Sequence, residues 1–158
     1  MKPEWPHLAR QTYALLMDID GRLDAQDRIA LRAMLPTAPG IEYYRILSRV
    51  PRAQADDADA EAVWRVVLRA LGELRCSGRG IGGALAETRY AEDRTSRIVT
   101  ATGGHLRAEI GAVIDWLIAH GERTSALWQV AALGIADALG DQDALQWARR
   151  AIAMDYVR

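Results

Sequence analysis

Apolar side chains recur every three to four residues along almost the whole chain, and this period constrains the fold more than any other feature. The clearest example spans about residues 57–76, with apolar positions at Val63, Val66, Val67, Ala70, Leu71 and Leu74. Such spacing places apolar side chains on one face of an α-helix. No stretch of the 158 residues shows the sustained apolar–polar alternation of a half-buried strand. The sequence therefore predicts an all-α helical bundle with no significant sheet.

Glycine, proline and capping residues divide this pattern into about seven to nine helices. Asp24, with Asp27 three residues later, has the spacing of a capping box, and Asp141 is a candidate N-cap of the last helix. The expected breaks lie at Gly21, Pro36, Pro51, the polar segment 52–60, the glycine-rich segment 76–83, Gly103–Gly104, Gly121 and Gly140. The main helices are expected at about 5–19, 57–76, 91–102, 106–120 and 124–139. The length favours one domain over residues 1–158, with possible lobes at about 1–76 and 81–158.

A single cysteine, Cys76, excludes an intramolecular disulfide and a zinc site built from thiolates alone. In a helical stretch a lone cysteine is expected to be a small buried hydrophobe rather than a nucleophile. No apolar run reaches the roughly 18 residues that span a bilayer. Residues 1–6 lack the apolar centre of a signal peptide. We therefore expect a cytoplasmic protein that makes no membrane contact.

The sequence offers no recognisable catalytic set. The three histidines belong to no HExxH motif, and the serines have no base partner nearby; the histidines are His7, His105 and His120. The glycine-rich segment 76–83 has neither P-loop nor Rossmann spacing. Helix capping explains carboxylate pairs such as Asp18 and Asp20 better than a metal does. We therefore expect no enzymatic activity, no cofactor, no metal and no small-molecule substrate.

The positive charge is almost entirely arginine. Nineteen arginines accompany one lysine, while the formal net charge is −1. Between Arg65 and Arg107 eight arginines face only four acidic residues. Genome base composition can produce such an arginine bias, so the count alone does not indicate a binding site. A neutral protein with a basic middle segment can still present a basic face.

Three arginines of this segment are candidates for one phosphate-binding face. Arg94 and Arg97 are helical neighbours at i and i+3, and Arg107 opens the next expected helix across the Gly-Gly break. Guanidinium groups so placed could bridge successive phosphates, and Arg32 could be a fourth. The alternative is a solvated face with arginines paired to nearby acids. The five tryptophans are expected to pack in the core rather than stack on bases; they are Trp5, Trp64, Trp116, Trp128 and Trp147.

Several stretches, taken in order, resemble the CasB family, the small subunit of the type I-E CRISPR Cascade complex. They are Arg32-Ala-Met-Leu-Pro, Ile41-Glu-Tyr-Tyr-Arg45, Gly80-Ile-Gly-Gly-Ala-Leu-Ala86, Glu92-Asp-Arg-Thr-Ser-Arg-Ile-Val-Thr-Ala101, Leu106-Arg107, Trp128 and Trp147-Ala-Arg149. No single stretch is specific, but their order and spacing cover about residues 25–158. Three positions depart from the family pattern: Gly83 replaces an arginine, Thr95 an aromatic residue, and Leu127 an aspartate.

The resemblance implies a two-lobed helical protein that works inside a larger complex. Its partners would be the other Cascade subunits, a second copy of itself, the guide RNA, and the target and displaced DNA. Base pairing with the guide reads the sequence, so contacts with the nucleic-acid backbone suffice. Carried over by position, the contact candidates are Arg32, Arg94 and Arg107, then Arg97, with Arg45 and Arg149 weaker. At Gly83, which replaces the family's arginine, the resemblance implies a weaker backbone contact than in its relatives. The alternative is a helical protein–protein scaffold without direct nucleic-acid contact.

Overall fold

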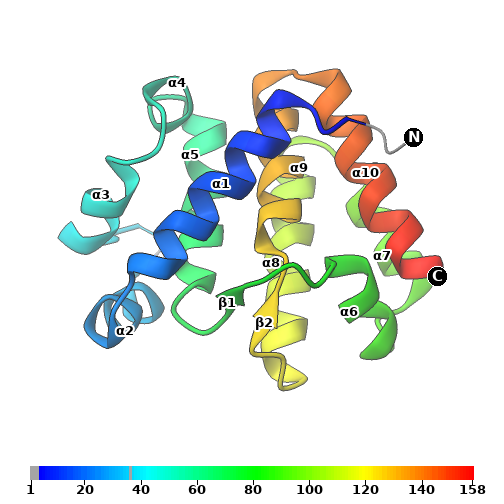
Figure 1. Ribbon diagram of the computed structural model, residues 1–158, viewed down its shortest axis with the longest axis horizontal. Helices are drawn as coiled ribbons and strands as arrows, with labels where there is room; N and C mark the ends of the chain where they lie inside the picture. Colours follow the sequence, from blue (N-terminus) through cyan, green and yellow to red (C-terminus); the bar gives the residue numbers. More distant parts are fainter. Residues whose placement is uncertain (1–3, 36) are drawn as a thin grey trace.

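The computed structural model describes residues 4–35 and 37–158, and these residues form an all-α bundle (Figure 1). The helices are α1 (His7–Arg22), α2 (Ala25–Ala33), α3 (Ile41–Leu47), α4 (Arg52–Ala55), α5 (Ala58–Ala70), α6 (Ile81–Glu87), α7 (Glu92–Thr100), α8 (Gly103–Ala119), α9 (Leu127–Leu139) and α10 (Gln142–Val157). The predicted fold class is confirmed. The helices of the described part number ten rather than seven to nine.

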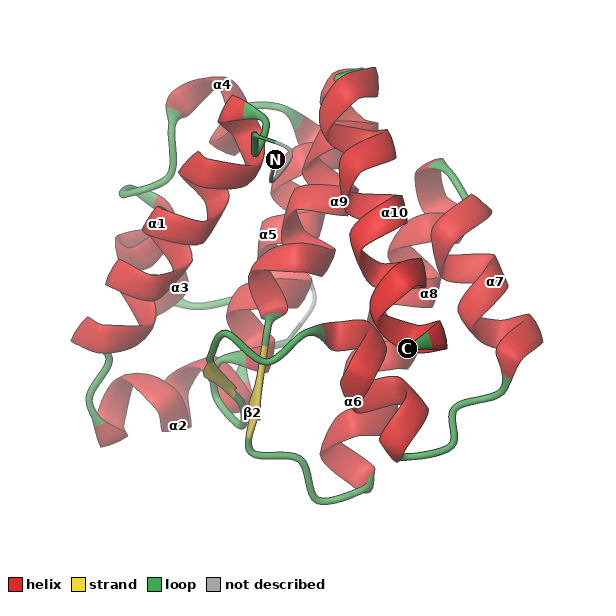
Figure 2. Cartoon of the chain, turned by 45° about the vertical axis from the view of Figure 1, so that its right-hand side comes forward, coloured by secondary structure: helices red, strands yellow, loops and turns green. Residues whose placement is uncertain are grey.

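The only strands among the described residues are two short segments that pair in parallel. β1 (Arg75–Cys76) lies beside β2 (Thr124–Ser125), and the amide of Ser77 donates to the Ser125 carbonyl at 3.0 Å. The yellow β2 segment in Figure 2 runs into α9. The pair therefore links the glycine-rich segment to the start of α9, and it forms no sheet of consequence.

Helix α9 is the centre of the bundle. Every residue from Leu127 to Ala136 is buried, and the helix packs against α1, α5, α8 and α10. Buried apolar side chains from Leu8 in α1 to Ile152 in α10 belong to one hydrophobic cluster. The segments expected as two lobes therefore share one core, and α9 runs through it.

Polar side chains of α9 and α10 fix where two neighbouring helices begin. Gln129 of α9 accepts a hydrogen bond from the Ile81 amide at 2.8 Å, and Asp137 accepts one from the Gly103 amide at 2.7 Å. Asp155 of α10 likewise accepts from the Gly83 amide at 2.8 Å. Amides in the first turn of a helix have no partner within that helix. Side chains of α9 and α10 thus cap the first turns of α6 and α8, although they lie far away in the sequence.

The two predicted capping residues are confirmed. Asp24 and Asp27 form a reciprocal capping box at the start of α2, and Asp141 accepts from the Ala144 amide at 3.1 Å at the start of α10. The predicted break at Gly21 is wrong, because Gly21 lies inside α1. Glycine is tolerated in a helix at a modest cost, and the chain leaves the helix only at the extended Leu23.

Other boundaries differ from the prediction because tertiary pairing overrides the local pattern. The polar segment 52–60 is not a loop: it holds α4 and the capped start of α5. The helix expected to reach residue 76 ends at Ala70, and the one expected from residue 124 begins at Leu127, because β1 pairs with β2. The Gly-Gly break is the first turn of α8, where Gly103 has a φ of 59°. Pro36, the expected end of α2, lies outside the described residues.

The end of α2 is held tightly against the end of α5. A Cβ atom on Gly72 would lie 2.6 Å from the backbone nitrogen of Arg32, so only glycine permits the backbone of α2 to approach this closely. The Arg28 side chain donates to the Leu71 carbonyl at 2.7 Å and pairs with Asp20 at 3.0 Å. These contacts place the last turn of α2, and with it Arg32, beside the C-terminal end of α5.

We expect Gly134→Ala to lower the free energy of unfolding by about 1–3 kcal/mol, because adding atoms to a tight core costs about that much. The new Cβ would lie 2.8 Å from Val63 Cγ1 and 3.0 Å from Ile110 Cδ1. Gly21→Ala is the matched control, because its Cβ meets no atom within 4 Å and alanine favours the helix. Urea unfolding followed by circular dichroism measures both variants. Unchanged stability of Gly134→Ala would contradict the close packing of α5, α8 and α9.

Candidate functional site

Helices α5 and α8 run side by side in parallel. Near their starts Arg107 of α8 pairs with Asp59 of α5 at 3.5 Å. One turn further, Val63 and Ile110 meet over Gly134 of α9. Beyond this point the two helices border a cleft of about 220 Å³, which the end of α2 closes on one side.

Three arginines line this cleft. Arg65 and Arg69 are four residues apart on α5 and therefore share a face. Arg32 comes from the last turn of α2. Arg65 pairs with Glu61 at 2.7 Å, and this hydrogen bond raises the pKa of the guanidinium, which stays charged. Arg32 and Arg69 are exposed, and neither pairs with a carboxylate of the described chain.

The remainder of the cleft is apolar, with two carboxylates. Val66 and Ile114 face it from α5 and α8, and Gly111 leaves space on α8, where a Cβ would meet no atom within 4 Å. Glu73 and Asp115 are exposed at the cleft and form no ion pair within the described residues. The cleft thus offers guanidinium donors, carboxylate acceptors and an apolar surface together.

Arg94, a leading candidate from the sequence, lies elsewhere. Its guanidinium stacks over the Tyr90 ring at 4.5 Å and lies 5.7 Å from the Trp116 ring centre. Trp116 follows Arg107 by nine residues, about two and a half helical turns, so the two occupy opposite sides of α8. The structure therefore does not bring Arg94 and Arg107 together on one face.

The other sequence candidates are largely engaged within the chain. Arg97 pairs with Asp93 at 3.4 Å, and Arg45 pairs with Glu42 at 2.6 Å. Arg149 is half-buried, and it donates to the Ala101 carbonyl at 3.3 Å, which holds α10 to the segment between α7 and α8. Of the six candidates, only Arg32 reaches the cleft lining.

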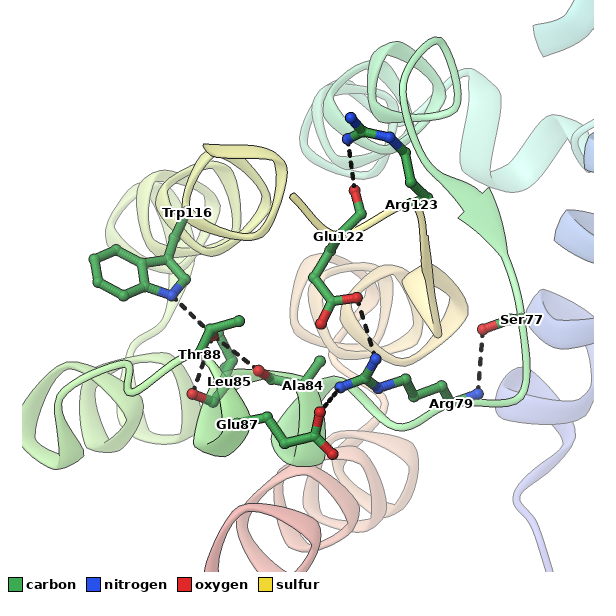
Figure 3. A network of polar contacts seen from close by, with 9 residues as sticks. All are labelled: Ser77, Arg79, Ala84, Leu85, Glu87, Thr88, Trp116, Glu122 and Arg123. Atoms are coloured by element: carbon green, nitrogen blue, oxygen red, sulfur yellow. Dashed lines mark hydrogen bonds and ion pairs between the residues drawn. The ribbon is translucent and has the colours of Figure 1, made fainter. Parts of the chain in front are cut away.

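Arg79 shows how the basic middle segment is neutralised (Figure 3). Its guanidinium forms ion pairs with Glu87 of α6 and with Glu122, the latter at 3.2 Å. The Arg79 amide also donates to the Ser77 hydroxyl. With the pairs already described for Arg65, Arg97 and Arg107, four of the eight arginines between residues 65 and 107 face a carboxylate. The segment is therefore less basic on the surface than its sequence indicates.

The tryptophans pack mostly as the sequence predicts. Trp64 is fully buried, and its indole nitrogen donates to Gln54 at 2.9 Å. Trp128 is buried and stacks on Trp5 at 4.7 Å with an interplanar angle of 19°. Trp116 donates from its indole nitrogen to Thr88 at 3.0 Å (Figure 3). Trp5 alone is exposed, and its stacking partner is Trp128 rather than a ligand.

Comparisons with known proteins identify no similar protein. No family model, no curated protein and no solved structure matches the chain. Within residues 4–35 and 37–158 no group of three histidine, cysteine, aspartate or glutamate side chains could hold a metal ion. Over the same residues no helix combines the length and apolar character needed to cross a membrane.

Arg65, Arg69 and Glu73 were not assigned to the site from the sequence. Their spacing of four residues was visible in the sequence. The opposite wall was not, because nothing local shows that α8 lies beside α5, or that Gly111 leaves room there. The cleft becomes apparent only in three dimensions, where the arginines of α5 lie opposite the glycine-containing helix α8.

The only cysteine is a poor nucleophile. Cys76 is buried, as predicted, and removal from water raises the pKa of its thiol to about 11. The folded pKa lies above that of an unfolded cysteine. The associated stability is therefore complete below the unfolded pKa and is lost as the pH rises through the folded value.

We expect iodoacetamide to alkylate Cys76 at pH 8 at least about tenfold more slowly in the native protein than in urea, because the thiolate is the reactive form. Mass spectrometry of timed samples measures both rates. Equal rates in the two states would show that the thiol is accessible and that this account of its burial is wrong.

Proposed function

We propose that this protein is a non-catalytic, nucleic-acid-binding subunit of the CasB type, acting within a type I-E CRISPR surveillance complex. It would contact nucleic-acid backbone without reading sequence, and so stabilise the guide RNA–target DNA hybrid and the displaced strand. The ordered resemblance over about residues 25–158 supports the family assignment. The arginine-lined cleft between α5 and α8 is the single observation that carries the proposed contact with nucleic acid.

The charges around the cleft favour a phosphate ligand. Arg32 and Arg69 present guanidinium groups without carboxylate partners in the described chain, and a planar guanidinium matches the geometry of phosphate oxygens. Arg107 lies one turn before Gly111 on the same face of α8, and so extends the arginine row away from the cleft. Its pairing with the exposed Asp59 at 3.5 Å is a weak surface interaction, which a phosphate could replace.

A second candidate function is a helical protein–protein scaffold. It is favoured by the pairing of Arg45, Arg97 and Arg107 with carboxylates of their own chain. Large apolar side chains are also exposed near α2 and α3, such as Ile29 and Ile41 at 52% and 69%. Under this alternative the cleft arginines would bind no nucleic acid. Purification of the tagged protein separates the two functions, since co-purifying RNA of uniform length supports the nucleic-acid subunit.

We expect the protein to bind single-stranded DNA with a salt-dependent affinity, at a non-specific dissociation constant of roughly 10⁻⁴–10⁻⁶ M. The logarithm of the affinity should fall with the logarithm of salt concentration at about −0.7 per neutralised phosphate. Arg69→Gln and Arg32→Gln should each make this slope less steep by somewhat under one unit. Fluorescence anisotropy at several salt concentrations measures it.

Arg97→Gln is the matched control, because the same exchange removes an exposed guanidinium on α7 that does not line the cleft. It should leave the slope unchanged. If the wild-type protein shows no salt-dependent binding, either alone or within its complex, the nucleic-acid function is wrong and the scaffold remains. If Arg97→Gln changes the slope more than Arg69→Gln does, the nucleic acid binds at a surface other than the cleft.

A further inference from the structure

We propose that the Trp5 ring is a stacking platform for one unpaired base of a bound single strand, on a surface separate from the cleft between α5 and α8. This inference rests on the proposed function and deepens it, because it names the part of the nucleic acid that this second surface contacts. Stacking on an aromatic side chain is tolerant of sequence, since every base has a π-face. The platform therefore agrees with a protein that does not read sequence.

Trp5 belongs to a cluster of aromatic side chains from helices α1, α9 and α10, which pack against one another (Figure 1). Its ring stacks on Trp128 of α9, with centroids 4.7 Å apart and an interplanar angle of 19°. Tyr13 of α1 lies 5.7 Å from the Trp5 ring and 5.3 Å from the Trp128 ring. Trp147 of α10 lies 5.2 Å from the first and 5.9 Å from the second. Because Tyr13 and Trp147 each contact both rings, they lie beside the stack.

The face of Trp5 that points away from Trp128 is thus left open by the cluster. A ring covering that face would lie much farther from Trp128 than from Trp5, and neither neighbour does. Trp5 is 37% exposed, while Trp128 beneath it is 4% exposed. A single exposed aromatic residue is normal on a protein surface. Here three neighbouring rings hold the indole in one orientation, so little conformational freedom is lost when a further ring stacks on it.

The shape of the platform favours a flat ring over a cationic ligand. An aromatic cage surrounds a cation with several ring faces, whereas this cluster presents the one flat face of Trp5. Parallel stacking is already the arrangement of Trp5 on Trp128, and a base would extend the same stack outward.

The charges beside the platform permit contact with the flanking phosphates but contribute little. Exposed arginines lie one helical turn from the cluster on both sides, Arg10 on α1 and Arg150 on α10. Arg10 meets Glu4 at 3.8 Å with both side chains exposed, which is a weak pair. Glu4 and the exposed Asp143 of α10 offset the two guanidinium groups. Affinity at this surface should therefore come mainly from stacking and depend little on salt.

Stacking on Trp5 requires a base that is free of its neighbours. Bases within a duplex already stack on one another, and aromatic side chains receive bases that are splayed out of single-stranded segments. Within the proposed function, the platform would therefore contact the displaced DNA strand and not the guide RNA–target DNA hybrid.

The test compares a labelled deoxythymidine oligonucleotide with an abasic strand of the same length by fluorescence anisotropy, so that the number of phosphates is constant. The wild-type protein should bind the strand with bases about tenfold more tightly. Trp5→Leu keeps an apolar side chain on the cluster but offers no flat ring. It should remove most of this preference while abasic binding and the salt slope stay unchanged, and Trp5→Tyr should restore it.

Tyr44→Leu is the matched control, because it removes an aromatic side chain that is 49% exposed on α3, outside the cluster. It should keep the tenfold preference, and circular dichroism checks that every variant is folded. A preference retained by Trp5→Leu would overturn the platform. Salt-dependent binding by the wild type with no preference for bases would overturn the platform and leave the proposed function standing. Absence of binding to both strands, alone and within the complex, would overturn both.

Discussion

The burial of α9 is the constraint on which the rest of the structure depends. A helix buried on almost every side needs helices all around it, and α1, α5, α8 and α10 provide them. Gly134 lets Val63 and Ile110 approach its backbone, so α5 and α8 converge over the middle of α9. Beyond this point the two helices border the arginine-lined cleft. The polar side chains Gln129 and Asp137 then determine where α6 and α8 begin.

The arginines fall into two groups with different physical roles. Some are committed to the fold: Arg28 pairs with Asp20 with only 11% of either side chain exposed, and Arg79 bridges Glu87 and Glu122. Removing one partner of a buried pair is costly, so Arg28 serves stability. Arg69 has no such commitment within the described chain. This division explains how a chain of net charge −1 can still present guanidinium groups to a polyanion.

The fold class and several helix ends could be predicted from the sequence because they depend on local chemistry. The capping box at Asp24 and the apolar period of α5 are examples. The end of α5 at Ala70 could not, since it depends on pairing between β1 and β2, whose partners lie far apart in the chain. The site was only partly predictable for the same reason. Arg32 was selected from its sequence context, but its meeting with Arg69 depends on the close approach of α2 to Gly72.

The central claim is that nucleic acid contacts the open side of α5 and α8 and not the surface around Arg94. Amide chemical-shift mapping by NMR, with a single-stranded DNA oligonucleotide titrated into the labelled protein, tests it most directly. We expect the largest shifts at Arg69, Gly111 and Asp115, which lie on two helices that are far apart in the chain and border one cleft. Shifts confined to α7 around Arg94 and Arg97, or no shifts at saturating oligonucleotide, would contradict the account.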